Sequence, residues 1–332
     1  MKKFKLVILW VLFSGLSSMA MGSLPIAKTS VLVVDEEGNS IENAEVVFCY
    51  NKPKPSGTGW GTISYGNTKY TDSNGMCSDS NITSNDYGYN VIKDGYYRSI
   101  VNAKPNQVNS GKWFPWNEMI TIVLRKKNNP VDMYVKKIRN VKIPIVNQLV
   151  GFDFEQGDFV APYGRGVYAD ISFISFYDYV SGKEAKAGVE ILFESSDDKL
   201  QKIIFDDYKD SQYKWPYEAE FNHNAKKSIK KHISFKAGHL ETNFDKNVNY
   251  TFRVRTQLDS SGNVVSASYG KILGDFDIGY KGEISFTYYF NPDGTRNLEF
   301  DPDKNLFNYD SKKKKFNNKF HRMAKEYRVR TP

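Results

Sequence analysis

The chain has 332 residues, enough for two ordinary domains, and a formal net charge of +8. Apolar residues make up 40% of it, which is enough to build hydrophobic cores and excludes a disordered chain. The charge lies at the two ends, because residues 311–332 sum to +8 and residues 1–22 to +3, which leaves −3 for residues 23–310. This slightly acidic body argues against nucleic acid as a partner.

Residues 1–22 are typical of a secretory signal peptide. Three lysines precede an almost wholly apolar run, Leu6–Leu16, and small residues then allow cleavage after Ala20 or after Gly22. An uncleaved signal anchor is the alternative, because no charge occurs from Leu6 to Ala27. The apolar core is short and favours cleavage. The sequence therefore predicts export to the periplasm, the cell surface or the extracellular space.

Short runs of alternating apolar and polar residues follow, separated by turn formers such as EEGNS, TDSNG and KDGY. Ala44, Val46, Phe48 and Tyr50 share one face of such a run, as in a half-buried strand. The run 119–124 is apolar on both faces, so we expect a central strand there.

The second half of the chain shows the same alternation more strongly. The apolar positions are Val167, Ala169, Ile171 and Phe173; Val189, Ile191 and Phe193; Tyr250, Phe252 and Val254; and Ile284, Phe286, Tyr288 and Phe290. A boundary is expected at 125–130, followed by an extended linker strand over 131–146. Residues 213–231 break the alternation and predict a short helix or a long loop. The chain is therefore predicted to be all-β, with two β-sandwich-like domains.

The first half resembles the carboxypeptidase regulatory-like domain, a transthyretin-like β-sandwich. The likeness covers about residues 28–127 and is carried by Gly38, Ala44, the turn TDSNG at 71–75 and the run 87–95 ending in KDGYY. An insertion, NKPKPSGTGWGTISYGN, departs from the family pattern and leaves the strand register there open. The resemblance implies an ancillary module without catalytic residues. Residues 140–310, an aromatic-rich β domain, are similar to a block in uncharacterised exported bacterial proteins, for which no activity is implied.

Cys49 and Cys77 are the two cysteines of the chain. An even number of cysteines in an exported protein permits a disulfide, which would stabilise the fold by about 3 kcal/mol. Two buried free thiols are the alternative.

Aromatic residues make up 15% of the chain, and the segment WFPW places Trp113 and Trp116 close together in loop-like sequence. Exposed rings of this kind stack on sugar faces, so the pair is a candidate ligand-binding site. Aromatic side chains also fill sandwich cores and anchor loops, which is the simpler interpretation.

The sequence shows no pattern for a cofactor or a catalytic centre. The spacings of His223, His232 and His239 fit no zinc motif, and no nucleophile elbow or phosphate-binding glycine loop occurs. Asp301 and Asp303 alternate like calcium ligands but lack the rest of that motif. We therefore expect no metal and no cofactor.

The basic tail, residues 311–332, holds nine of the chain's lysines and arginines. Its candidate contacts to an anionic surface are Lys312, Lys313, Lys314, Lys315, Lys319 and Arg322. A helix there would gather Phe316, Phe320, Met323 and Tyr327 on one side, so docking on the protein's own body is the alternative.

Together these features predict an exported, non-catalytic binding or structural-interaction protein of the cell envelope. Its expected partners are an envelope polysaccharide or an anionic surface. The alternative is a secreted hydrolase of glycans or peptides with its site in the second β domain.

Overall fold

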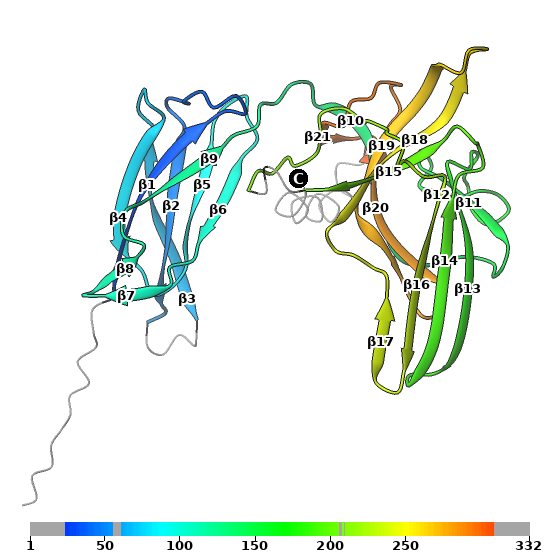
Figure 1. Ribbon diagram of the computed structural model, residues 1–332, viewed down its shortest axis with the longest axis horizontal. Coiled ribbons are helices and arrows are strands. Elements are labelled where there is room, and N and C mark those ends of the chain that lie inside the picture. Colours follow the sequence, from blue (N-terminus) through cyan, green and yellow to red (C-terminus); the bar gives the residue numbers. More distant parts are fainter. Residues whose placement is uncertain (1–23, 56–60, 206–207, 209, 309–332) are drawn as a thin grey trace, which may run out of the picture.

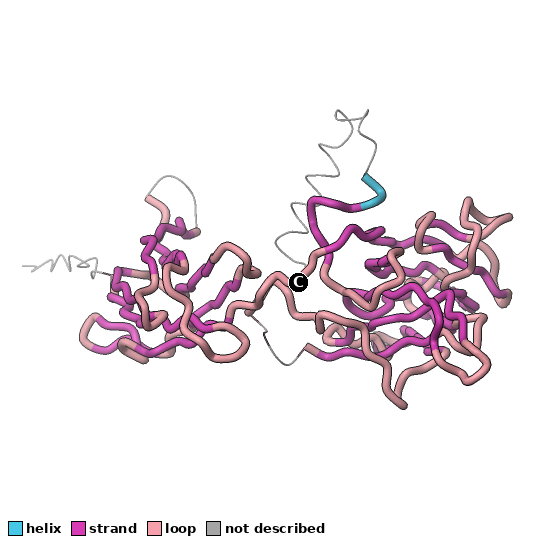
Figure 2. The backbone as a smooth tube through the Cα atoms, turned by 90° about the horizontal axis from the view of Figure 1, so that it is seen from above, coloured by secondary structure: helices cyan, strands magenta, loops and turns pink. Residues whose placement is uncertain are grey.

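The computed structural model describes residues 24–55, 61–205, 208 and 210–308. The predicted signal peptide and the basic tail lie outside these residues. Regular structure in the described part is β, apart from one short 3-10 helix, η1 (Leu306–Asn308). Two groups of strands, β1 to β9 and β10 to β21, lie side by side (Figures 1 and 2). The predicted all-β fold is confirmed.

The first sandwich is formed by a five-stranded and a four-stranded sheet. The five-stranded sheet contains β1 (Ile26–Val34), β4 (Met76–Ile82), β7 (Gln107–Asn109), β8 (Lys112–Phe114) and β9 (Glu118–Val123). The four-stranded sheet has the order β3-β2-β5-β6, with β2 (Glu45–Pro53), β3 (Thr62–Tyr70), β5 (Tyr87–Ile92) and β6 (Ser99–Ala103). Ala44, Val46, Phe48 and Tyr50 are buried in the core between the sheets, as the alternation predicts.

The prediction of a central strand at 119–124 was wrong. β9 pairs only with β1 and forms an edge of its sheet, with Met119 48% exposed. Ile122 is buried in the core, so one face of this strand packs and the other meets solvent. A run that is apolar on both faces therefore does not distinguish a central strand from an edge strand.

The insertion that interrupts the family pattern lengthens a hairpin. β2 and β3 pair antiparallel without a register shift from Glu45 opposite Tyr70 to Pro53 opposite Thr62. The register that the sequence left open is therefore continuous.

The second sandwich consists of two six-stranded sheets. One has the order β15-β18-β19-β20-β10-β21, with β10 (Val131–Lys142), β15 (Lys199–Ile204), β18 (Val248–Leu258), β19 (Val264–Ile278), β20 (Glu283–Asn291) and β21 (Phe300–Asn305). The other has the order β12-β11-β13-β14-β16-β17, with β11 (Leu149–Asp153), β12 (Asp158–Phe159), β13 (Ile171–Ser181), β14 (Glu184–Leu192), β16 (Ser228–Lys236) and β17 (His239–Thr242).

The core of the second sandwich is aromatic. Phe154 stacks on Phe252 with ring centroids 4.6 Å apart, and the Tyr288 hydroxyl donates a hydrogen bond to the Phe154 carbonyl. Three of the four predicted apolar faces are buried there throughout: those starting at Val189, Tyr250 and Ile284. The fourth is buried only from Ile171 onward, because Val167 lies in a loop and is 66% exposed.

The expected linker strand is an inner strand of the second sandwich. β10 pairs antiparallel with β20 and parallel with β21, and its Met133 and Ile138 are buried. The segment 205–227 contains no helix or named strand among its described residues, which agrees with a long loop, and β16 begins at Ser228.

Candidate functional site

The outer face of the sheet that contains β18, β19 and β20 is only partly covered. Gly270 and Ile272 face the core, so their neighbours Tyr269 and Lys271 point outward. Two chain segments cross this outer face and pair with each other: the Ala219 N–H bonds to the Arg296 carbonyl at 2.7 Å, and the Leu298 N–H to the Tyr217 carbonyl at 2.8 Å. The area that these segments leave open is a groove.

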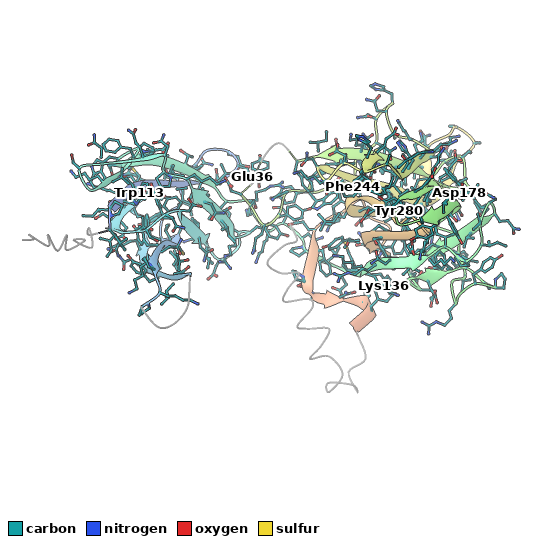
Figure 3. All side chains as sticks on the ribbon, turned by 90° about the horizontal axis from the view of Figure 1, so that it is seen from below. Glu36, Trp113, Lys136, Asp178, Phe244 and Tyr280 are labelled. Atoms are coloured by element: carbon teal, nitrogen blue, oxygen red, sulfur yellow. The ribbon has the colours of Figure 1, made fainter. Side chains whose placement is uncertain are left out.

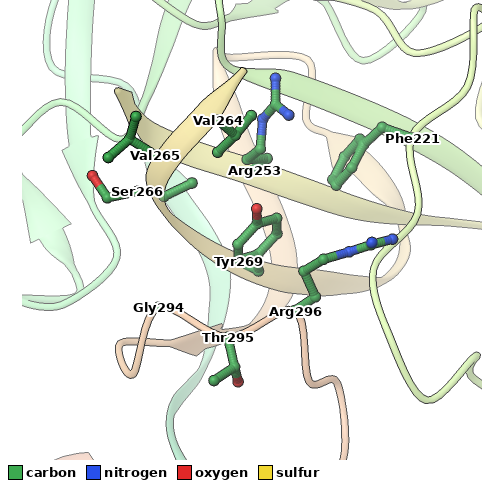
Figure 4. A pocket seen from close by; sticks show the side chains of 10 residues that line it. Phe221, Arg253, Val264, Val265, Ser266, Tyr269, Gly294, Thr295 and Arg296 are labelled. Atoms are coloured by element: carbon green, nitrogen blue, oxygen red, sulfur yellow. The ribbon is translucent and has the colours of Figure 1, made fainter. Parts of the chain in front are cut away.

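The groove has a volume of about 530 Å³ (Figure 4). Residues from four parts of the chain line it, among them Phe221, Arg253, Val264, Ser266, Tyr269 and Arg296. Its lining contains two arginines and no carboxylate, histidine or lysine. The surface is therefore cationic, with apolar and hydroxyl groups between the charges.

A small separate cluster forms the floor of the groove. Ala219, Ala267, Tyr269 and Leu298 are buried in it, and the half-buried Phe221 packs against them. The rings of Phe221 and Tyr269 have centroids 6.3 Å apart. The floor is thus an aromatic surface fixed by its own packing.

Arg253 lies directly opposite Tyr269 in the pairing of β18 with β19, which places both on the groove face. Its Nη2 donates to the Asp197 carbonyl at 2.7 Å, and its guanidinium lies 5.6 Å from the Phe221 ring centroid. Its Nε is buried without a hydrogen-bond partner in the described part of the chain. An unsatisfied buried N–H costs about 1–3 kcal/mol.

Arg296 is exposed and is held by one bond, from its Nε to the Ala219 carbonyl at 2.6 Å. Within the described residues, neither Arg253 nor Arg296 forms a salt bridge. The hydroxyls of Tyr269 and Ser266 have no hydrogen-bond partner among those residues either. The groove therefore holds two hydroxyls and two guanidinium groups without a salt-bridge partner in this part of the chain, although the charge of Arg253 also interacts with the buried Asp198 carboxylate.

Sequence reasoning missed this site. The alternation in β18 places Arg253 on the face away from the core-facing Phe252 and Val254, so the sequence could have predicted this one groove residue as outward-facing. Phe221 and Arg296 come from loops, whose positions no periodic pattern fixes.

Lys271 lies next to the groove, under the crossing segments, and is fully buried. Its ammonium donates to the Leu298 carbonyl at 2.7 Å and lies 4.9–5.1 Å from the ring centroids of Tyr213, Trp215 and Tyr289. Burial lowers the pKa of Lys271 to about 7, Glu299 opposes this effect, and Arg125 adds to it. Aromatic faces attract a cation, and this enclosure replaces part of the lost hydration.

The same segments connect the two sandwiches through Arg125 and Glu36, and Figure 3 marks Glu36 at this junction. Arg125 Nε bonds to Glu36 at 2.8 Å, and its Nη1 donates to the Trp215 carbonyl at 2.6 Å. The Tyr217 hydroxyl donates to Glu36 at 2.6 Å. The junction is a network of buried and half-buried polar groups.

Glu299 completes this junction from the second sandwich. Its carboxylate accepts hydrogen bonds from the Tyr97 hydroxyl at 2.9 Å and from the backbone N–H groups of Asn128 and Asn129 at 3.0 and 2.6 Å. Three donors satisfy this buried charge. Residues of both sandwiches and of the segment between them therefore meet at one carboxylate.

The tryptophans predicted as a ligand platform lie on the first sandwich, where Figure 3 labels Trp113. The Trp113 indole donates to the Thr83 carbonyl at 2.9 Å, and its ring packs against the first core. Trp116 is half-buried, with the Lys112 ammonium 4.8 Å from its ring centroid. The structure thus gives Trp113 an anchoring contact.

Replacing Trp113 with alanine is expected to lower the free energy of unfolding by about 2–4 kcal/mol, because it removes a packed ring and a hydrogen bond. Thermal unfolding checks this, with Trp113→Phe as the matched control, which keeps the ring and should lose about 1 kcal/mol. An unchanged stability together with weaker polysaccharide binding would instead make Trp113 a ligand contact.

Cys49 and Cys77 are free thiols, so the structure does not contain the predicted disulfide. They lie on strands of opposite sheets, Cys49 on β2 and Cys77 on β4. Cys77 packs against the first core, whereas Cys49 alternates with the core-facing Phe48 and Tyr50 and so points outward. Burial raises the pKa of both thiols, that of Cys77 to about 11.

No three histidine, cysteine, aspartate or glutamate side chains gather as a metal site in the residues that the structure describes. None of the helices in that same part is long and apolar enough to cross a membrane. The candidate tail contacts, from Lys312 to Arg322, lie outside it.

No protein-family model matches the chain, and neither does any curated protein. The resemblance to the carboxypeptidase regulatory-like domain therefore stays a prediction.

Three solved structures show a remote likeness. A 3-chlorocatechol 1,2-dioxygenase from Rhodococcus opacus 1CP is 11% identical over 32% of this chain and 61% of its own, with a TM-score of 0.25. A streptococcal ancillary pilin is 12% identical over 82% and 62%, with a TM-score of 0.20. The shaft pilin SpaA from Lactobacillus rhamnosus GG is 11% identical over 74% and 92%, with a TM-score of 0.23. At TM-scores this low, the likenesses carry no conclusion about what this chain binds or does.

Proposed function

We propose that this chain is an exported, non-catalytic binding or structural-interaction protein of the cell envelope, and that the groove of the second sandwich is its contact surface. The observation that supports this most directly is the pair Arg253 and Arg296, which line one groove without forming a salt bridge among the described residues. Sites for small ligands combine an apolar surface with a few converging polar groups, and this groove has that composition. Its charge favours an anionic partner.

The other parts of the chain take supporting roles in this proposal. Residues 1–22 direct export, residues 28–127 act as a spacer of the regulatory-like type, and residues 140–310 hold the binding surface. The basic tail, residues 311–332, adds electrostatic attachment to an anionic surface. The hydrolase alternative finds no supporting feature in the groove, whose lining offers no carboxylate or histidine as a general acid or base.

Co-sedimentation with isolated cell envelope and insoluble polysaccharides, at low and high salt, tests this proposal. The double variant Arg253→Gln, Arg296→Gln is expected to lose most of the binding. Lys186→Gln is the control for charge, because Lys186 is exposed on β14 of the opposite sheet. A third variant carries glutamine at the candidate tail positions from Lys312 to Arg322.

The outcomes separate the parts of the proposal. Binding that only the tail variant abolishes, and that salt removes, would assign attachment to the tail and count against the groove. Binding equal in all variants would contradict both sites. If nothing sediments under any condition, the binding function itself is wrong.

A further inference from the structure

The two groove arginines are held so that part of each guanidinium stays available. Arg253 uses Nη2 for the Asp197 carbonyl, and Arg296 uses Nε for the Ala219 carbonyl. Both bonds go to backbone oxygens, and the charge of Arg253 also interacts with the buried Asp198 carboxylate, without a salt bridge among the described residues. A guanidinium fixed in this way presents its remaining N–H groups in a planar fork, the geometry that matches a planar carboxylate.

The groups between the arginines fit a sugar ring. Phe221 is half-buried and offers an apolar face, and apolar faces of sugars pack on such rings. The Tyr269 and Ser266 hydroxyls both donate and accept hydrogen bonds, as sugar hydroxyls require. Figure 4 shows the Tyr269 hydroxyl on the side of its ring that faces Arg253. A ligand that meets these groups together carries a carboxylate, hydroxyls and an apolar ring face.

The volume of the groove and the charge of its lining limit the class of ligand further. A volume of about 530 Å³ lies within the usual range for ligand sites of roughly 300–1,000 Å³, so the groove holds a short segment of a polymer rather than a folded partner. The absence of lysine from the lining favours planar recognition over point-charge attraction.

We infer that the groove binds a uronic-acid polysaccharide. Arg253 and Arg296 receive the carboxylates, Phe221 packs against a sugar face, and Tyr269 and Ser266 bond to sugar hydroxyls. This inference rests on the proposed function, because it names the ligand class of the same groove.

Calorimetric titration of the folded chain with oligogalacturonate tests the inference, with the same oligosaccharide reduced to its neutral form as the second probe. We expect the acidic probe to bind and the neutral one to bind roughly tenfold to a hundredfold more weakly, the loss of a charged hydrogen-bond pair. Arg253→Gln and Arg296→Gln should each weaken the binding of the acidic probe by a similar factor. Phe221→Ala should weaken both probes, and Lys186→Gln should change neither by more than about twofold.

Three results would overturn the inference. If the neutral probe bound as tightly as oligogalacturonate, the groove would not recognise carboxylates. If dextran sulfate bound as tightly as oligogalacturonate or more tightly, the groove would be a general polyanion site. Oligogalacturonate binding unaffected by the groove variants would place the ligand elsewhere. Each of these leaves envelope binding intact, whereas loss of sedimentation with every envelope fraction would defeat the proposed function itself. Circular dichroism of each variant confirms that it is folded.

Discussion

Replacing Arg255 with alanine is expected to lower the free energy of unfolding by about 3–5 kcal/mol, because it leaves buried carboxylates without their cation. Arg255 bonds to both oxygens of Asp170 at 2.7 and 3.0 Å and to Glu155 at 2.8 Å. The Asp170 side chain is fully buried, and Asp153, 3.6 Å from the same guanidinium, is 1% exposed.

The pH dependence of this loss gives an independent check. Burial raises the pKa of Asp170 even with Arg255 present, so acid protonates this carboxyl and removes the charge that the variant cannot neutralise. The deficit of Arg255→Ala should therefore shrink as the pH falls. Denaturant unfolding at several pH values measures both effects.

Arg165→Ala is the matched control, because Arg165 pairs with Asp158 at 3.4 Å while its side chain is 86% exposed. Such surface pairs contribute about 0–1 kcal/mol. Equal losses in Arg255→Ala and Arg165→Ala would contradict the role of the buried cluster.

The stability of the second sandwich is expected to rise with pH between about 7 and 9 because of Lys271. In the folded chain its pKa is about 7, whereas its ordinary value is 10.5, so across this window the unfolded chain binds more protons. Stability then increases by roughly 1.4 kcal/mol per pH unit for this one group. Above about 9 the raised pKa values of Cys77 and of the buried tyrosines act in the opposite direction.

Urea unfolding followed by tryptophan fluorescence at pH 7, 8 and 9 tests this expectation, since the buried Trp215 adjoins Lys271. Lys271→Met keeps a long side chain between the rings and removes the titrating amine, so the rise should disappear. A wild-type curve that is flat over the window, or a Lys271→Met variant with the same slope, would show that Lys271 does not titrate there.

Period-two alternation predicted the strands well where one face is buried. Phe252, Phe286 and Phe290 lie in the core as expected, because a strand that packs on one side must alternate. The same rule failed at Val167 and Ala169, where a loop continues the pattern before β13 begins at Ile171. Backbone hydrogen bonds to the Asp153 carboxylate hold this loop at Val167 and Tyr168, and alternation carries no signal for such contacts.

Contacts between side chains that lie far apart in the sequence could not be predicted either. Arg255 has a φ of 56° at an irregularity in the pairing of β18 with β19, and this turns it toward carboxylates far away in sequence. Lys271 and Glu299 were likewise invisible as buried charges, because their partners Trp215 and Tyr97 come from other segments. Spacing within one segment cannot show contacts of this kind.

The position of β10 sets the order in which the second sandwich can be completed. This strand leaves the ribosome first among those of its sheet, yet its hydrogen-bonded neighbours, β20 and β21, are the last two strands of the described chain. The strand that carries Met133 and Ile138 therefore remains without its paired neighbours until nearly the whole chain has emerged. During synthesis, this segment consequently waits longer for its sheet neighbours than any other strand of that sheet.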